Sequence, residues 1–212
     1  MRSIRIGSRG SQLALAQVDE VIGILGHREI GVKIFDTAGD RDRETPLDKV
    51  AGTDFFTDRL ERALLGKEID LAVHSAKDLP DRRQEGLMIA MITDPIDSDD
   101  ALVSRGKLKL AELSCGARVG TSSQRRKEQL LGIRPDLSVL DLRGNVDERI
   151  AKLDRGEYDA IVLAAAGLIR LGLRERISER LPFDTAKGQG SLALEVRADD
   201  KELSEWLREK FI

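Results

Sequence analysis

The chain has 212 residues, of which 41% are hydrophobic and 34% charged, with a formal net charge of −3. This near balance of charge argues against a nucleic acid or a membrane surface as a partner, and 3% of aromatic residues leave little for base stacking. The single cysteine excludes an intramolecular disulfide, and the first residues lack the apolar core of a signal peptide, so we expect a cytoplasmic α/β protein.

Strands and helices are predicted to alternate through the first half of the chain. One predicted helix begins after Ser11, whose hydroxyl can cap it, and a second spans residues 57–65 and ends at Gly66. Residues 38–54 form a polar loop whose length is typical of functional or mobile loops. The predicted strands are residues 3–6, 32–37, 69–73 and 88–93.

The second half continues this alternation after an expected change of domain near residues 94–104. Segment 117–131 predicts a strand, a tight turn and a helix, and two further helices are predicted at 145–156 and 200–211. The last helix presents one apolar face, made by Leu203, Trp206, Leu207 and Phe211. The remaining strands are predicted at 138–142, 158–164 and 191–197. The alternation favours parallel sheets built from βαβ units.

The stretch VHSAKDLP, residues 73–80, places a lysine and an aspartate at the end of an apolar strand. In open α/β sheets, ligands bind outside the carboxyl ends of the strands, so Lys77 and Asp78 are candidates for an active site. The alternative is a surface ion pair that contributes little to stability. For His74, a hydrogen-bonding role is the more common one at a strand end.

A second polar stretch, VGTSSQRR, covers residues 119–126 and supplies hydroxyl and backbone N–H groups at a helix start, where anions bind. Arg125 and Arg126 fall in the first turn, at the positive end of the helix dipole, and a bound anion would offset that cost. A solvated helix start with tolerated arginines is equally compatible with this segment. Other arginines also follow predicted strands, namely Arg9, Arg143 and Arg170, and Arg149 lies one turn into the helix after Arg143.

Arginine's planar guanidinium suits carboxylates, so these residues together predict a cleft for a polyanion. Asp78 would be a lone carboxylate among the cations, which would keep it ionised. Such a group can stabilise a developing cation or transfer a proton.

Long motifs of the chain resemble the porphobilinogen deaminase (hydroxymethylbilane synthase) family. The matching segments are SRGSQLALAQ, ETPLDKVAG, ALLGKEIDLAVHSAKDLP, VGTSSQRRKEQLL, RPDLSVLDLRGNVDERIAKLDRGEYDAIVLAAAGLIRLGL and GQGSLALEVR. The resemblance implies a transferase of heme biosynthesis. It joins porphobilinogen units head to tail into a linear tetrapyrrole, releases ammonia and uses a dipyrromethane cofactor.

The resemblance also implies roles for individual residues. Asp78 would be the catalytic carboxylate that stabilises the pyrrole cation formed when ammonia leaves. Lys49 and Phe56 would belong to a loop over the cleft, and Gln189 to the segment that crosses back between domains. The residues implied to hold acetate and propionate groups are Arg9, Ser11, Lys49, Lys77, Thr121, Ser123, Arg125, Arg126, Arg143, Arg149 and Arg170.

The fold implied by the resemblance is α/β, with two domains of periplasmic-binding-protein type and a cleft between them. We expect domain 1 to comprise residues 1–93 and 186–212, and domain 2 to comprise residues 94–185. The family's third, α+β domain, whose cysteine anchors dipyrromethane through a thioether, is expected to be absent. Cys115 does not match that anchor, and a lone cysteine in its position is typically an inert filler.

The loop also departs from the family, because Thr53 stands where a lysine is usual and Asp54 adds an opposing charge. Without the anchor, dipyrromethane could be held non-covalently, the product could be shorter or untethered, or the chain could bind pyrroles without turnover. The leading hypothesis is the enzyme, and the alternative is a binding protein for pyrroles or another small polyanion. The expected partner is porphobilinogen, with no nucleic acid, no membrane, no metal and a monomeric state.

Overall fold

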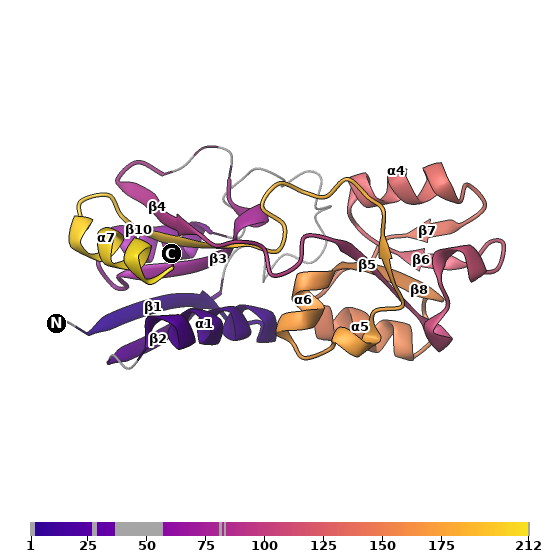
Figure 1. Cartoon of the computed structure of the whole chain (residues 1–212), viewed down its shortest axis with the longest axis horizontal. Helices are drawn as coiled ribbons and strands as arrows, with labels where there is room; N and C mark the ends of the chain where they lie inside the picture. Colours follow the sequence, from indigo (N-terminus) through magenta and orange to yellow (C-terminus); the bar gives the residue numbers. More distant parts are fainter. Residues whose placement is uncertain (1–2, 27–28, 37–56, 81, 83, 212) are drawn as a thin grey trace. The chain divides into compact units, whose positions relative to one another are not determined.

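The computed structural model describes residues 3–26, 29–36, 57–80, 82 and 84–211. The predicted polar loop over 38–54 lies outside these residues. The described residues form two compact units (Figure 1): unit 1 runs to Pro95 and resumes at Ser191, and unit 2 comprises Ile96–Gly190. The domain boundaries predicted from the sequence fall after residues 93 and 185.

Unit 1 is built on a five-stranded sheet with the strand order β2-β1-β3-β10-β4. The first three of these strands are parallel, and β10 runs antiparallel to both β3 and β4. The strands are β1 (Ile4–Arg9), β2 (Ile30–Phe35), β3 (Leu71–Ser75), β4 (Leu87–Ile92) and β10 (Leu192–Arg197).

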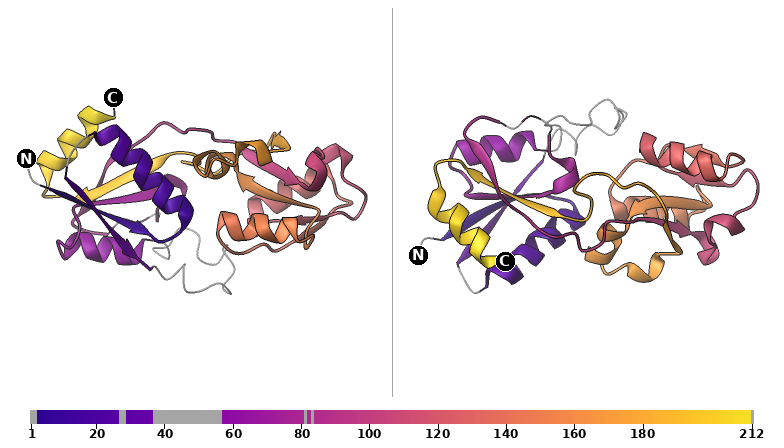
Figure 2. Two further views of the ribbon diagram at one scale, coloured as in Figure 1. Left: turned by 90° about the horizontal axis from the view of Figure 1, so that it is seen from below. Right: turned by 45° about the horizontal axis from the view of Figure 1, so that its top comes forward.

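Helices cover both faces of this sheet. Helices α1 (Gln12–Leu25) and α7 (Lys201–Lys210) lie side by side on one face and α3 (Asp58–Leu65) lies on the other (Figure 2). The Ser11 hydroxyl accepts a hydrogen bond from the Ala14 amide at 3.2 Å, so the predicted cap of α1 is confirmed. The predicted apolar face of α7 is also confirmed, because its four residues pack into the core shared with α1.

Unit 2 repeats the same sheet plan with the order β7-β6-β8-β5-β9. Its first three strands are parallel, and β5 is antiparallel to both β8 and β9. The strands are β5 (Asp100–Ser104), β6 (Arg118–Gly120), β7 (Ser138–Leu140), β8 (Ala160–Ala164) and β9 (Glu179–Leu181).

Successive side chains of β5 and β8 point to opposite faces of the sheet, so the core of unit 2 has two parts. Leu102 and Val162 pack with Leu130 of α4 (Gln124–Ile133). Their neighbours along each strand point to the other face, where they meet α5 (Val146–Asp154) and α6 (Ala165–Arg170). The central strands of each sheet are therefore buried on both faces, which explains why they are nearly continuously apolar.

The prediction of parallel sheets is confirmed for three neighbouring strands of each sheet but not for the whole sheet. Each sheet contains one antiparallel strand, and in both units it is the first strand after the chain enters that unit: β5 in unit 2 and β10 in unit 1. Two consecutive parallel strands of one sheet need a crossover connection between them, which is usually a helix. A strand that arrives from another unit has no such connection to a neighbouring strand. The sequence analysis also missed α6, β9 and β5, the last of which lies within the segment assigned to the domain change.

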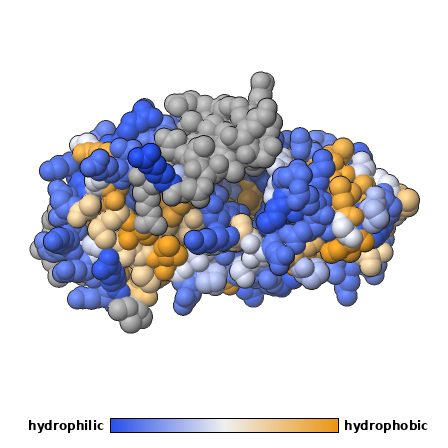
Figure 3. Space-filling view, turned by 90° about the horizontal axis from the view of Figure 1, so that it is seen from above, coloured by the Kyte–Doolittle hydropathy of each residue, from blue (hydrophilic) through white to orange (hydrophobic). Residues whose placement is uncertain are grey.

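The surface is mostly hydrophilic on the face drawn in Figure 3, with smaller apolar patches between the charged side chains. Large apolar side chains that remain exposed include Val32 and Ile34 on edge strand β2. In the described part of the chain, every helix is too short or too polar to traverse a lipid bilayer.

Asp70, at the amino end of β3, links the stability of unit 1 to pH. Burial by itself would raise the pKa of its carboxyl, but hydrogen bonds from Arg5 and Arg197 outweigh burial and lower the pKa from 3.8 to about 2. A carboxylate whose pKa is lower in the folded state stabilises the fold above its unfolded pKa and loses that contribution as the pH falls. We therefore expect about 2 kcal/mol of stability to disappear between pH 4 and about pH 2.

Urea unfolding at pH 5 and pH 2, followed by the fluorescence of Trp206, measures this contribution, because the sole tryptophan lies in α7 of unit 1. The control is Asp70→Asn, which should be less stable than the parent at pH 5 and nearly equal to it at pH 2. A stability difference that stays constant across this range would contradict the assignment.

Candidate functional site

In unit 1, the predicted site residues gather at the carboxyl edge of β1 and β3. Arg9 is the last residue of β1, and Ser11 follows as the cap of α1. Lys77, exposed, and Asp78, half-buried, lie in a 3₁₀ turn, η2 (Ala76–Asp78), directly after β3. Because β1 and β3 are parallel neighbours, their carboxyl ends meet at one edge of the sheet. This edge therefore carries the half-buried carboxylate of Asp78 together with the cationic residues Arg9 and Lys77.

The end of β3 is fixed by polar contacts on both faces of the sheet. On the α1 side, Gln17 Nε2 donates to Ser75 Oγ at 2.8 Å. On the α3 side, His74 Nε2 lies 3.0 Å from Glu195 Oε2 of β10, and both side chains are buried. The hydrogen bond expected for His74 therefore exists, with a partner 121 positions away in the sequence. These contacts order the strand end that precedes Asp78.

In unit 2, the predicted residues lie at the corresponding edge of the second sheet. Buried Thr121 and half-buried Ser123 follow β6, and Arg170 ends α6, which follows β8. Strands β6, β7 and β8 are parallel, so their carboxyl ends also meet at one edge. Arg170 Nη1 donates to the Gly190 carbonyl at 3.0 Å, which ties this edge to the segment that leaves the unit.

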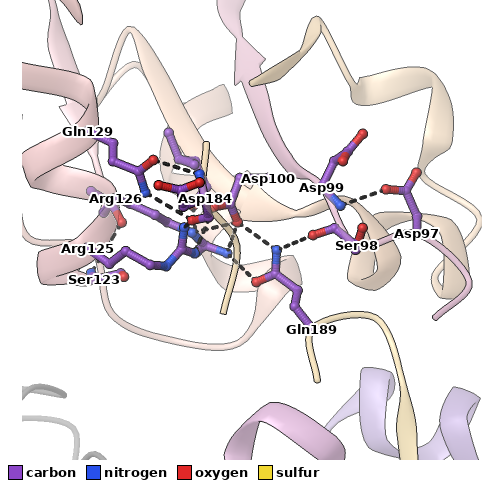
Figure 4. Close-up of polar contacts among 12 residues, drawn as sticks. Asp97, Ser98, Asp99, Asp100, Ser123, Arg125, Arg126, Gln129, Asp184 and Gln189 are labelled. Atoms are coloured by element: carbon purple, nitrogen blue, oxygen red, sulfur yellow. Dashed lines mark hydrogen bonds and ion pairs between the residues drawn. The ribbon is translucent and has the colours of Figure 1, made fainter. Parts of the chain in front are cut away.

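Arg125, Arg126 and Gln189 converge on one buried carboxylate, Asp100 (Figure 4). Burial alone would raise the pKa of Asp100, but Arg126, Gln189 and Arg125 outweigh it and hold the pKa below its usual value. Asp100 is the first residue of β5 and was missed by the sequence analysis. A sequence signal existed, because an aspartate that directly precedes an apolar strand must find partners once it is buried.

Arg143 and Arg149 lie around the start of α5. Arg149 Nε donates to the Gly144 carbonyl at 2.7 Å, and Lys152 Nζ donates to the Arg143 carbonyl at 2.9 Å. Arg143, Lys152 and Arg155 line a shallow depression of about 390 Å³ together with Gly144, Glu148 and Ala151. Cationic groups thus continue along this part of unit 2.

Three of the residues singled out in the sequence are not part of either sheet edge as the structure describes it. Lys49 and Phe56 lie outside the residues that the structure describes. Cys115 is exposed, so the expectation that it fills a gap in the core was wrong. It lies before the amino end of β6, whereas Thr121 and the arginines lie at the carboxyl end. Within the described residues, no cluster of three or more His, Cys, Asp and Glu side chains is arranged to hold a metal ion.

Comparison with known protein families shows to which family the chain belongs. The family model described as "Porphobilinogen deaminase, dipyromethane cofactor binding domain" matches residues 4–205. The chain belongs to the porphobilinogen deaminase family. This family membership confirms the resemblance found in the sequence motifs.

Curated relatives agree with the assignment to the porphobilinogen deaminase family. The porphobilinogen deaminase of Desulforudis audaxviator is 50% identical over 214 residues, covering 98% of this chain and 69% of that protein. The protein of the same name from Deinococcus radiodurans is 50% identical over 210 residues, covering 94% of this chain and 68% of that protein.

Two solved structures of low sequence identity share the fold of this chain. A putative methionine-binding lipoprotein from Bacillus subtilis has a TM-score of 0.57 at 14% identity, covering 99% of this chain and 90% of that chain. The BvgS VFT2 domain of Bordetella pertussis has a TM-score of 0.54 at 15% identity, covering 99% of this chain and 86% of that chain. The prediction of two α/β units of periplasmic-binding-protein type is confirmed.

Proposed function

We infer that the chain is a hydroxymethylbilane synthase-type transferase of tetrapyrrole biosynthesis. It joins porphobilinogen units head to tail and releases ammonia. The observation that carries this inference is Asp78, which lies half-buried directly after β3 in a chain of the porphobilinogen deaminase family. A carboxylate at the edge of a parallel sheet, next to Arg9 and Lys77, suits cation chemistry on an acidic substrate.

In the proposed mechanism, Asp78 acts where positive charge develops. The bond between the aminomethyl carbon and the protonated amino nitrogen of porphobilinogen breaks, ammonia leaves with the bonding electron pair, and the remaining positive charge is shared with the pyrrole nitrogen. The Asp78 carboxylate stabilises that charge and accepts a hydrogen bond from the pyrrole N–H. The free α-carbon of the acceptor pyrrole then forms the new C–C bond to the methylene carbon, and loss of its α-proton restores the aromatic ring. Contacts of Gln17 with Ser75 and of His74 with Glu195 hold the strand end that positions Asp78.

The acetate and propionate groups of the substrate require cationic and N–H donors. We propose that Arg9, Ser11 and Lys77 in unit 1 supply them near Asp78. In unit 2, we propose the same role for Thr121, Ser123, Arg125, Arg126, Arg143, Arg149 and Arg170. What supports this assignment is their arrangement after parallel strands, where backbone N–H groups and guanidinium forks suit carboxylates.

Dipyrromethane carries the same kinds of carboxylate, and the donors of unit 2 fit them because guanidinium and hydroxyl groups accumulate at one sheet edge. When bound, the cofactor supplies the pyrrole to which substrate is joined. We propose that unit 2 holds it through its carboxylates. Cys115 is a poor candidate for covalent attachment, since it lies before the amino end of β6, away from Thr121 and Ser123 at the carboxyl end.

The decisive test is porphobilinogen consumption by the purified chain, with the released ammonia quantified and the products separated by their number of pyrroles. Ammonia release coupled to a linear tetrapyrrole is the expected result. Saturable binding of porphobilinogen by the folded protein without ammonia release would contradict the transferase. It would favour the alternative of a non-catalytic pyrrole-binding protein.

A further inference from the structure

A fully buried carboxylate stands between two consecutive arginines at the start of α4 (Figure 4). Oδ1 of Asp100 accepts hydrogen bonds from Arg126 Nε at 2.9 Å and from Arg126 Nη2 at 2.6 Å. Oδ2 of the same carboxylate lies 2.7 Å from Arg125 Nη2. Among the described residues, Oδ1 therefore accepts hydrogen bonds from Arg126, while Oδ2 makes an ion pair with Arg125 and has no hydrogen-bond partner.

The side chains of the two arginines differ in their exposure and in their other partners. The side chain of Arg126 is 8% exposed, and besides Asp100 it donates to the Val162 carbonyl and to Gln189 Oε1. The side chain of Arg125 is 29% exposed and reaches the Asp184 carbonyl through Nη1. Arg126 is thus the inner, anchored guanidinium, and Arg125 is the outer one with surface open to a ligand.

Two guanidinium groups side by side in the first turn of a helix repel each other and the positive end of the helix dipole. An exposed arginine with a long flexible stem would turn away into water, and it would lose rotamer freedom each time it bound an anion. A buried carboxylate at fixed distance removes that freedom. Its position on β5 is set by pairing with β8, in which Asp100 lies opposite Ala164.

We propose that Asp100 is a positioning residue for carboxylate binding: it fixes the guanidinium of Arg125 in the orientation that receives an acetate or propionate group of the substrate. The proposal rests on the proposed function, since it deepens the role given there to Arg125. Asp100 itself touches no substrate. Gln189 Nε2 supports it from the returning segment, by donating to Asp100 Oδ1 at 3.0 Å and to the Ser98 carbonyl at 2.8 Å.

Asp100→Asn is the informative variant, because it keeps the shape and one oxygen but removes the charge. The oxygen can still face Arg126 and Gln189, while the amide nitrogen then opposes Arg125. Binding is measured by calorimetry with porphobilinogen in the Asp78→Asn background, where turnover is expected to be blocked. We expect Asp100→Asn to weaken binding by about 10-fold or more, because it removes the charge that pairs with Arg125.

A double-mutant cycle with Arg125→Ala separates positioning from a general structural effect. If Asp100 acts through Arg125, then Asp100→Asn weakens binding when Arg125 is present and has little further effect when it is absent. Equal effects of Asp100→Asn in both backgrounds would overturn the proposal. Should Asp100→Asn fail to fold, Asp100→Glu in the same cycle keeps the charge, shifts the carboxylate and should show the same dependence on Arg125.

Asp70→Asn is the matched control, because Asp70 is also a buried carboxylate shared by two arginines, Arg5 and Arg197, but lies at the amino end of β3. It should lower stability and leave the affinity for porphobilinogen unchanged. An equal loss of affinity in Asp70→Asn would count against the proposal. If the Asp78→Asn parent itself fails to bind porphobilinogen, the proposed function fails first, and the positioning role of Asp100 falls with it.

Discussion

Replacing Asp78 by asparagine should reduce ammonia release from porphobilinogen by at least about 100-fold. The amide keeps the size and one oxygen of the carboxylate but loses its negative charge, so it cannot stabilise the cation that forms as ammonia leaves. Asp78 is half-buried in a short turn and is not a member of the hydrophobic clusters formed by the described residues of unit 1. The measurement is steady-state ammonia production, with substrate binding determined separately by calorimetry.

Binding of porphobilinogen should survive in Asp78→Asn, since the cationic groups that hold the carboxylates are untouched. A matched control is Asp19→Asn, on the exposed surface of α1, which should retain the parental rate. Parental ammonia release by a folded Asp78→Asn protein would remove Asp78 from the catalytic role.

Arg197→Met should lower the free energy of unfolding of unit 1 by about 3–5 kcal/mol, the cost of breaking a buried ion pair. The Arg197 guanidinium donates to the carbonyls of Leu64 and Ile69, at 3.1 and 2.6 Å, and to the carboxylates of Asp70 and Asp200. It thereby connects β10 to the end of α3, to the entry of β3 and to the cap of α7. Methionine fills similar volume but cannot donate to these buried oxygens.

Urea unfolding monitored by Trp206 fluorescence reports this loss in unit 1. Arg155→Met is the control, because Arg155 is 60% exposed and pairs only with exposed Glu157 across two positions of one turn. That substitution should change stability by less than about 1 kcal/mol. An Arg197→Met protein with the parental midpoint would show that the buried contacts of Arg197 contribute little.

Local patterns in the sequence predicted most of the elements around the site. Ser11 and Gly66 mark the limits of α1 and α3, because capping depends on residues that are neighbours in the chain. The sequence also pointed to the arginines of unit 2, because each lies shortly after a predicted strand and the carboxyl ends of parallel strands share one edge. The roles assigned to these residues remain predictions.

Partners distant in the sequence could not be found in this way. His74 meets Glu195, and Arg126 meets Asp100, only because antiparallel strands from the other end of each unit enter the sheets. Local periodicity carries no information about that pairing. For the same reason, two consecutive arginines that resemble equivalent ligands in the sequence differ in the structure, where one is anchored and the other is partly exposed.

The position of β10 has a consequence for synthesis on the ribosome. This strand is translated after unit 2, yet it lies in the middle of the sheet of unit 1, between β3 and β4. The described part of unit 2 is one continuous stretch and can fold once Gly190 has emerged, whereas the nascent N-terminal strands must wait with two unpaired edges until residues 192–197 arrive. Vectorial folding should therefore complete the second unit before the first, and the waiting edges are where a chaperone would be needed.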